Sequence, residues 1–405
     1  MPDSLDSVLK SISKKFGSNV VKFGVDDLGG SGTLSFGSPS ADFCIYNSFP
    51  EGRIIEFSGA EGSGKTTSAF LVAADYQRKE LVRHPVGSSW VLHGEEHTGP
   101  RAIILLDNEG TADPIWARKL GYDMNDKNIK TIIIRPEAQS AEEIFDMAIA
   151  MLKTGDVGLM IFDSIATLVP QQIADESMEK QQMGGIAKAL TRFANTAIGL
   201  LRKYDTTLIA INQVRENISG YGDPLMTPGG RSWKHACSMR IMFKRGNFFD
   251  QDGNVLQKKD AQSPAGHEVE LYVLKTKVCK WDRKIGKYTL NYISGVDVLQ
   301  DTIDTAILLD LIDNSVQGTF KVLDPDTGNV MLDKDGAEVK IRGKKNLKPY
   351  FEQHPELWKR LYDIVYEKIS VRDDPDFVKS FEQMLNININ EKLGVDTTQT
   401  NLEEL

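Results

Sequence analysis

Short, largely apolar runs alternate with segments of helical spacing through the first half of this chain. The apolar runs have the length of buried strands and occupy residues 54–57, 103–106, 132–134, 159–162 and 208–211. Helical periodicity covers residues 68–77, 141–153 and 187–203 between them. Strands that alternate with helices predict an α/β fold, with a twisted and mostly parallel sheet flanked by helices.

The pattern changes on both sides of this alternation. Residues 239–243, 268–274 and 287–292 resemble strands without intervening helices, which predicts antiparallel strands added to the sheet. Residues 7–16 have the spacing of a short helix, and the Gly- and Ser-rich stretch 24–40 predicts a linker or loop. Beyond Gly295, Asp-Pro-Asp-Thr-Gly at 324–328 predicts a hairpin turn, and 357–369 has helical spacing.

These changes divide the 405-residue chain into four parts. We predict a helical arm with its linker at 1–33 and the main α/β core at 34–295. A small α+β domain at 296–372 and a weakly structured tail at 373–405 complete the chain. The hydrophobic content of 40% is enough to build a real core.

Composition limits where the protein works. No uninterrupted apolar run reaches the roughly 18 residues that a membrane-spanning helix needs, and the N-terminal residues lack a signal-peptide core. Cys44, Cys237 and Cys279 are few, scattered and odd in number. Free thiols in a reducing cytoplasm are therefore expected.

Charge is distributed unevenly around a net value of −9. This balance argues against a protein that coats nucleic acid with its whole surface, but residues 188–245 hold ten Lys/Arg against three acidic residues. Residues 340–348 hold five more basic residues, and 373–405 hold eight acidic ones. Basic islands with an acidic tail indicate a regulated polyanion binder, although ordinary solvated faces would have the same composition.

A phosphate-binding loop is the strongest motif. It lies between the apolar run at 54–57 and the helical segment at 68–77, which is the context that the G-x-x-x-x-G-K-[ST] pattern requires. The loop residues are Gly59, Ala60, Glu61, Gly62, Ser63, Gly64, Lys65, Thr66 and Thr67. Backbone N–H groups and the helix N-terminus would bind phosphate oxygens, Lys65 would reach the β- and γ-phosphates, and Thr66 would ligate Mg²⁺. A chance Gly-rich turn is the alternative.

Polar residues at the ends of three other strands complete this chemistry. Asp163 follows a four-residue apolar run and precedes Ser164, so it is the predicted acid for Mg²⁺; a turn aspartate after a buried strand is the alternative. Asp107 and Glu109 end another strand, and Glu109 is the candidate base that activates water. Gln213 ends a core strand where ligands bind in α/β sheets, which suits a sensor of the γ-phosphate.

Five motifs in order resemble the bacterial RecA recombinases. They are the loop at 59–67, Asp-Asn-Glu-Gly-Thr-Ala-Asp-Pro-Ile-Trp-Ala-Arg-Lys-Leu-Gly at 107–121, Phe-Asp-Ser-Ile-Ala at 162–166, Ile-Asn-Gln-Val-Arg at 211–215 and Thr-Pro-Gly-Gly at 227–230. The similarity extends from about Leu9 to about Ile369. It implies an ATP- and Mg²⁺-dependent filament on single-stranded DNA that pairs with homologous double-stranded DNA and hydrolyses ATP.

The resemblance also assigns residues around the nucleotide. Asp113 and Trp116 correspond to adenine contacts, although the family usually has Tyr at the second position. Lys275 and Lys277 resemble a pair that reaches ATP on the neighbouring subunit. Their alternate spacing directs both to one face of a strand, as an interface pair requires, whereas a solvated strand face is the alternative.

Two loops are implied to contact DNA. The first, 171–184, holds Met183, which either wedges between bases or begins a helix in the core. The second, 214–228, is polar and Gly-rich and leads directly into Gly229, Gly230 and Arg231. The DNA-binding candidates of this second region are Arg215, Asn217, Ile218, Tyr221, Gly229, Gly230 and Arg231. Lys188 and Arg192, one helical turn apart, are candidates for phosphate contacts.

The chain departs from the family pattern at several positions. The second loop is one residue shorter, Asn217 stands where a lysine is expected, and Leu225 stands where an acid is usual. His235 replaces an aromatic residue that the family uses between subunits. The connection at 80–101 is unusually long. It contains a His-x-x-Glu-His zinc pattern at 93–97, but Gly94 disfavours the helix that such a site needs, so a solvated surface insertion is expected.

Two other functions fit the same motifs. A ring-forming motor related to helicases would unwind DNA without strand exchange, and the N-terminal helix with its linker argues against it. An ATP-switched scaffold would bind DNA without hydrolysis, and the presence of both Glu109 and Asp163 argues against that.

Overall fold

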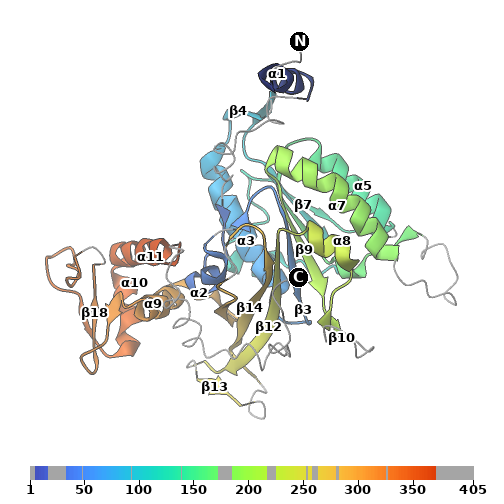
Figure 1. The fold of residues 1–405 in the computed structure, drawn as a ribbon. Coiled ribbons are helices and arrows are strands. Elements are labelled where there is room, and N and C mark those ends of the chain that lie inside the picture. Colours follow the sequence, from blue (N-terminus) through green and yellow to red (C-terminus); the bar gives the residue numbers. More distant parts are fainter. Residues whose placement is uncertain are drawn as a thin grey trace.

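A single large mixed sheet organises the protein (Figure 1). The computed structural model describes residues 5–16, 33–47, 49–92, 94–137, 139–171, 185–216, 225–251, 254–257, 263–279, 282–324 and 327–370. Within these residues the sheet has ten strands in the order β16-β15-β14-β12-β3-β9-β8-β6-β7, with β13 paired to β12. The strands are β3 (Ile54–Gly59), β6 (Ala102–Asp107), β7 (Thr131–Ile134), β8 (Val157–Asp163), β9 (Thr207–Gln213), β12 (Met239–Phe249), β13 (Val255–Leu256), β14 (Gly266–Thr276), β15 (Ile285–Asn291) and β16 (Gly295–Val296).

The predicted α/β fold is confirmed. Strands β12, β3, β9, β8, β6 and β7 run parallel to one another, whereas β14, β15 and β16 extend the sheet antiparallel from β12. Every residue of β3 and β8 is buried, as expected for strands covered on both faces. Because the parallel strands share one direction, the ends of β3, β6, β8 and β9 meet at one edge of the sheet, called here the carboxyl edge.

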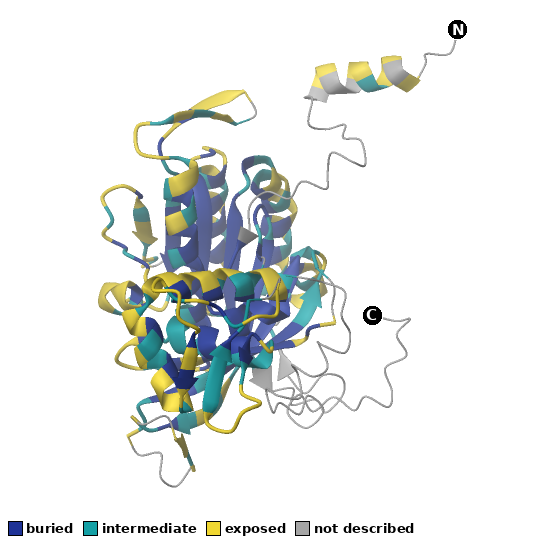
Figure 2. Cartoon of the chain, turned by 90° about the vertical axis from the view of Figure 1, so that its left-hand side faces the viewer, coloured by how far each residue is buried: buried dark blue, intermediate teal, exposed yellow. Residues whose placement is uncertain are grey.

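Helices cover both faces of the sheet. On one face, Ile55 and Phe57 pack with α3 (Lys65–Arg83) and α4 (Pro114–Lys119). On the other, Ile54 packs with α5 (Ala141–Leu152), α7 (Gly185–Tyr204) and α8 (Gly230–Ala236). Ser140 begins α5 through a capping box with Glu143, which satisfies free backbone donors of the first turn. Figure 2 shows the central strands almost wholly buried between these layers.

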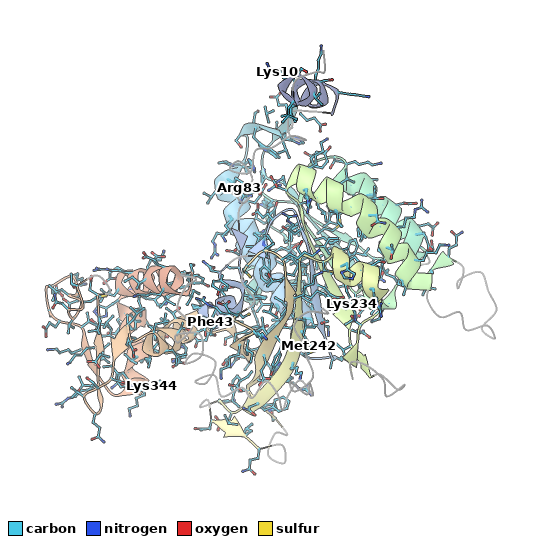
Figure 3. All side chains as sticks on the ribbon, viewed as in Figure 1. Lys10, Phe43, Arg83, Lys234, Met242 and Lys344 are labelled. Atoms are coloured by element: carbon cyan, nitrogen blue, oxygen red, sulfur yellow. The ribbon has the colours of Figure 1, made fainter. Side chains whose placement is uncertain are left out.

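A smaller unit follows the main sheet and has its own core. It contains α9 (Val298–Leu308), β17 (Ile312–Asp313), β18 (Thr319–Val322), β19 (Lys340–Arg342), η4 (Lys344–Asn346), α10 (Leu347–Gln353) and α11 (Pro355–Ser370). Its three strands pair antiparallel. Phe43 of η2 (Phe43–Ile45) packs into the core of this smaller unit and lies between the two units in Figure 3. The division at 34–295 and 296–372 stays a prediction.

The N-terminal part corrects one expectation. The stretch 24–40 was expected to be a linker or loop, but its described part contains β1 (Thr33–Leu34) and the start of α2 (Pro39–Asp42). Leu34 and Phe36 are buried in the main core, where Phe36 contacts the rings of Phe49 and Phe57. The loop prediction was wrong here because burial of these two apolar side chains stabilises an ordered segment despite the Gly and Ser residues around them. The predicted helix at 7–16 is α1 (Leu5–Phe16).

The insertion after α3 forms a hairpin of β4 (Ser89–Leu92) and β5 (Glu95–Thr98). Trp90 stacks between His84 and His97, with ring centroids 4.1 and 4.5 Å apart. Glu95–Thr98 therefore form a strand and not the helix that the metal motif at 93–97 needs, and His93 lies outside the described residues. None of the helices in the described part of the chain has the length and apolar character that crossing a bilayer requires.

A buried carboxyl joins the main core to α11. The Phe36 amide and the Tyr366 hydroxyl both donate to Asp42, at 2.8 and 2.7 Å. Burial raises the pKa of Asp42 from 3.8 to about 7. Nearby, Asp301 accepts from Ser38 and Ser40, and burial raises its pKa to about 6. This joint therefore holds protons that the unfolded chain would release.

We expect stability to fall as pH rises through this window. A raised pKa in the folded state gives stabilisation that is complete below pH 3.8 and is lost as pH approaches 7. Urea unfolding measures the free energy of unfolding at pH 5 and at pH 8. The decrease between these two pH values should be smaller in Asp42→Asn than in the wild type by roughly 2–4 kcal/mol. The exposed Asp146→Asn is the matched control. An unchanged pH dependence in Asp42→Asn would contradict the assignment.

Candidate functional site

The predicted phosphate loop joins β3 to α3 at the carboxyl edge. Gly59 and Gly64 have φ values of +157° and +91°. A Cβ atom on Gly59 would lie 2.4 Å from the Phe243 carbonyl oxygen, and one on Gly64 would lie 2.9 Å from Val269. Only glycine fits at these two points, because the loop is pressed against β12 and β14.

Lys65, the first residue of α3, turns back over the loop. Its ammonium group donates to the Ala60 carbonyl at 2.7 Å, and the Ser63 hydroxyl donates to the same oxygen at 2.8 Å. Burial lowers the pKa of Lys65, while the carboxylates of Asp163 and Glu109 act in the opposite direction. The ammonium group is therefore held inside the loop, within electrostatic range of these acids.

Thr66 and Asp163 meet beside the loop. The Thr66 hydroxyl donates to Asp163 Oδ2 at 2.6 Å, and Asp163 is only 4% exposed. Burial raises the pKa of Asp163 to about 6. A hydroxyl and a carboxylate that already lie together match the oxygen ligands that Mg²⁺ prefers, so these two residues fit the ion. In the described residues no group of three or more His, Cys, Asp or Glu side chains is arranged to hold a metal.

Glu109 is the meeting point of three strand ends. The Ser164 hydroxyl donates to Glu109 Oε1 at 2.8 Å, and the Gln213 amide donates to the same oxygen at 3.2 Å. These residues follow or end β6, β8 and β9, which are neighbours in the sheet. A carboxylate that can accept a proton thus lies at the same edge as the phosphate loop, in contact with an amide that can respond to a ligand.

Asp107 and Arg135 are residues whose roles the sequence did not reveal. Asp107 accepts from the backbone amides of Thr111 and Ala112 and pairs with Arg135 Nε at 2.9 Å. It thereby shapes the turn that carries Glu109. The signal was present, since Asp107 ends a strand and Arg135 directly follows another, but strand order was needed to bring them together.

Asp113 and Trp116 belong to the next segment. Asp113 caps α4 by accepting from the Ile115 amide at 2.8 Å. The Trp116 indole donates to the Thr67 hydroxyl at 3.3 Å and packs partly against the main core. The indole therefore reaches the helix that begins at the phosphate loop, whereas Asp113 stays exposed.

Lys275 and Lys277 lie at the opposite edge of the sheet. Leu271 is in register with Phe243, and Phe243 with Gly59, so Lys275 is roughly 13 Å further along β14. Both ammonium groups donate to carbonyls near the end of α8: Lys275 to Lys234 at 2.5 Å and Lys277 to His235 at 2.6 Å. Burial, followed by the Lys277 charge, lowers the pKa of Lys275 to about 8. Figure 3 shows Lys234 on α8.

Several predicted DNA contacts line one hollow between α7 and α8. The hollow has a volume of about 650 Å³ and includes Lys188, Arg192, Gly229, Gly230 and Arg231. The sequence did not single out four polar residues that also line it, Thr191, Asn195, Thr196 and Ser232. Lys188 and Arg192 lie on successive turns of α7, so their charges face the same space.

The remaining predicted DNA contacts fall in or near the two predicted loops. Met183, Asn217, Ile218 and Tyr221 lie outside the described residues. Arg215 lies in β10 (Arg215–Glu216), which pairs with β11 (Leu225–Met226), but only its backbone is described.

The fold and loop define an α/β protein of the P-loop nucleotide-binding class. Comparison with known proteins narrows this class: residues 3–297 match the RecA N-terminal domain family, and the chain belongs to the RecA family, whose members are ATPases. It is 28% identical to Protein RecA of Lactobacillus acidophilus over 93% of each chain. It is 28% identical to Protein RecA of Nitratiruptor sp. over 91% of this chain and 94% of that one. Protein RecA of Fusobacterium nucleatum is 31% identical over 76% of this chain and 73% of its own.

Proposed function

We propose that this protein is an ATP-dependent recombinase that forms a filament on single-stranded DNA and carries out homologous pairing and strand exchange. The observation that supports it most is the position of Gln213. Its amide contacts Glu109 at the phosphate-loop edge, and its strand continues directly into the predicted DNA segment 214–228. One strand end can therefore respond to nucleotide and to DNA.

ATP is the proposed substrate, bound by the loop at 59–67. Backbone amides and the α3 N-terminus would receive the phosphates, and Lys65 would exchange the Ala60 carbonyl for phosphate oxygen. Thr66 and Asp163 would hold Mg²⁺, which neutralises phosphate charge when bound. Glu109 would take a proton from water, with Ser164 and Gln213 orienting its carboxylate. Asp113 and Trp116 are the proposed adenine contacts.

We infer that the nucleotide site is completed by a neighbouring subunit. Lys275 and Lys277 lie too far along β14 to reach the loop of their own chain. In a head-to-tail filament the edge that carries them would face the carboxyl edge of the next copy. The arm at 1–33 is the proposed tether between such copies.

We also propose that the basic residues at 340–348 of the small domain capture double-stranded DNA, with the acidic tail at 373–405 competing for the same surface. Of the basic residues at 340–348, Lys344 pairs with Asp304 at 2.9 Å and Lys348 with Asp297 at 2.5 Å. Lys340 also pairs with Glu338. Double-stranded DNA would have to compete with these carboxylates. The proposed regulation by the tail at 373–405 involves residues outside the described part of the chain.

The decisive experiment combines turnover and microscopy. ATP hydrolysis should rise on addition of single-stranded DNA, and electron microscopy with DNA and a non-hydrolysable ATP analogue should show helical filaments. Strand exchange should follow with a homologous duplex. Closed rings with unwinding activity would favour the motor, and tight ATP binding without hydrolysis would favour the scaffold.

Removing the charges of Lys188 and Arg192 on α7 should weaken the binding of single-stranded DNA and also reduce its dependence on salt concentration. Each phosphate contact on a single strand contributes about 0.7 to the slope of log K against log salt. Lys188→Ala with Arg192→Ala should therefore lower the slope by about 1.4. The matched control is Arg202→Ala with Lys203→Ala, at the far end of the same helix. Equal slopes in both double variants would argue against this surface.

A further inference from the structure

A fully buried carboxylate connects the phosphate-loop strand to both ends of the predicted DNA segment. Glu56, three residues before Gly59 in β3, is 0% exposed. It faces the α7–α8 layer, on the same side as Ile54. An ionised group at this position is costly unless its oxygens are fully paired.

Partners from three other segments converge on Glu56. Asn212 Nδ2 and Trp233 Nε1 donate to Oε1 at 2.8 and 3.0 Å. Arg240 Nε donates to Oε2. These residues come from β9, α8 and β12, and Figure 1 shows those elements around β3. The contacts define the Glu56 hub: Glu56, Asn212, Trp233 and Arg240.

The hub holds the segment 214–228 at both ends. At its start, Asn212 immediately precedes Gln213. At its end, Asn212 Nδ2 also donates to the Pro228 carbonyl at 3.0 Å, and Arg240 Nη2 donates to the Thr227 hydroxyl at 3.2 Å. The adjoining Gly229 packs so closely on Trp233 that a Cβ would lie 3.0 Å from the indole.

One amide in the hub is incompletely satisfied. Asn212 Oδ1 is buried and has no hydrogen-bond partner within the described structure. Its neighbour Gln213 donates to Glu109, and a γ-phosphate would offer that amide a more strongly charged acceptor. A backbone shift that followed at Gln213 would also move the adjacent Asn212, which contacts both Glu56 and Pro228.

We propose that Glu56 is a positioning residue through which nucleotide binding at the loop sets the arrangement of the DNA segment 214–228. This inference rests on the proposed function and names the regulation of the same site. Glu56 does not touch ATP or DNA. It fixes Asn212, Trp233 and Arg240 relative to β3, so that a movement at Gln213 reaches Thr227 and Pro228 instead of being absorbed locally.

The measured quantity is the nucleotide response: the Kd for a fluorescent single-stranded oligonucleotide without nucleotide, divided by the Kd with a non-hydrolysable ATP analogue. We expect a response of tenfold or more in the wild type, within the usual range of coupling between sites. Glu56→Gln keeps the size of the side chain but removes the charge opposite Arg240. It should reduce the response by about tenfold, with analogue binding in the absence of DNA changed less than about twofold.

Two further variants separate coupling from folding. Thr227→Val is nearly isosteric and removes only the hydroxyl that accepts from Arg240, so a reduction of about threefold is expected with an unchanged melting temperature. Glu80→Gln is the matched control. Glu80 is a buried carboxylate paired with Arg101 at 2.9 Å, at the far end of α3. Its response should equal that of the wild type.

The outcomes are distinct. A wild-type response in folded Glu56→Gln and Thr227→Val overturns the inference, and an equal loss in Glu80→Gln does so as well. If Glu56→Gln fails to fold, Thr227→Val decides alone. If the wild-type protein binds no single-stranded DNA, or binds it without regard to nucleotide, the proposed function itself fails and the inference fails with it.

Discussion

Replacing Lys65 with alanine is expected to reduce ATP turnover by on the order of 10²–10³-fold. The Lys65 ammonium lies over the loop, bound to the Ala60 carbonyl at 2.7 Å, where phosphate oxygens would replace that weaker acceptor. Charge that develops on the transferred phosphoryl group would then lose its closest cation. A neutral water in the space left by the Lys65 side chain would not replace its positive charge.

Steady-state hydrolysis with and without single-stranded DNA measures this effect. Lys79→Ala is the matched control, because Lys79 lies on the same helix and pairs with Asp75 at 2.7 Å, away from the loop. Its turnover should be unchanged. Comparable turnover in Lys65→Ala and the wild type would remove the loop from the chemistry and reject the proposed site.

Lys275→Ala is expected to lower DNA-stimulated turnover on the order of 100-fold, although the variant keeps an intact phosphate loop. The reason is geometric. Lys275 lies at the opposite edge of the sheet and is held there by the Lys234 and His235 carbonyls. Its loss would affect hydrolysis only through the next subunit, so ATP binding to the isolated chain should be preserved.

Mixing the two inactive variants provides the test. Filaments that combine Lys65→Ala with Lys275→Ala contain some interfaces in which an intact loop meets an intact Lys275. Random mixing of head-to-tail contacts should restore about one quarter of the wild-type turnover. A mixture as inactive as its components would show that Lys275 acts within its own chain. Lys79→Ala mixed with Lys275→Ala controls for dilution.

Local signals in the sequence identified the elements well. The loop at 59–67 can be recognised from adjacent residues alone, because its glycines, its lysine and the apolar run before it make up the whole pattern. Strand and helix types followed from periodicity for the same reason. The loop prediction for 24–40 was wrong at 33–40, where Leu34 and Phe36 are buried in the main core and Phe36 contacts Phe49 and Phe57. The Gly and Ser residues of this stretch indicate a loop, and the local composition does not report these distant contacts.

The sequence alone determined the phosphate loop, the alternation of strands and helices, and the identity of the polar residues at strand ends. Only the tertiary structure decided which of these meet. Strand order makes β9 and β12 the neighbours of β3, although they are distant in the chain. It therefore brings Gln213 to Glu109, Arg240 to Glu56, and Lys275 to the edge far from Gly59. Periodicity reports which face of an element is buried, but it carries no information about the partner that covers it.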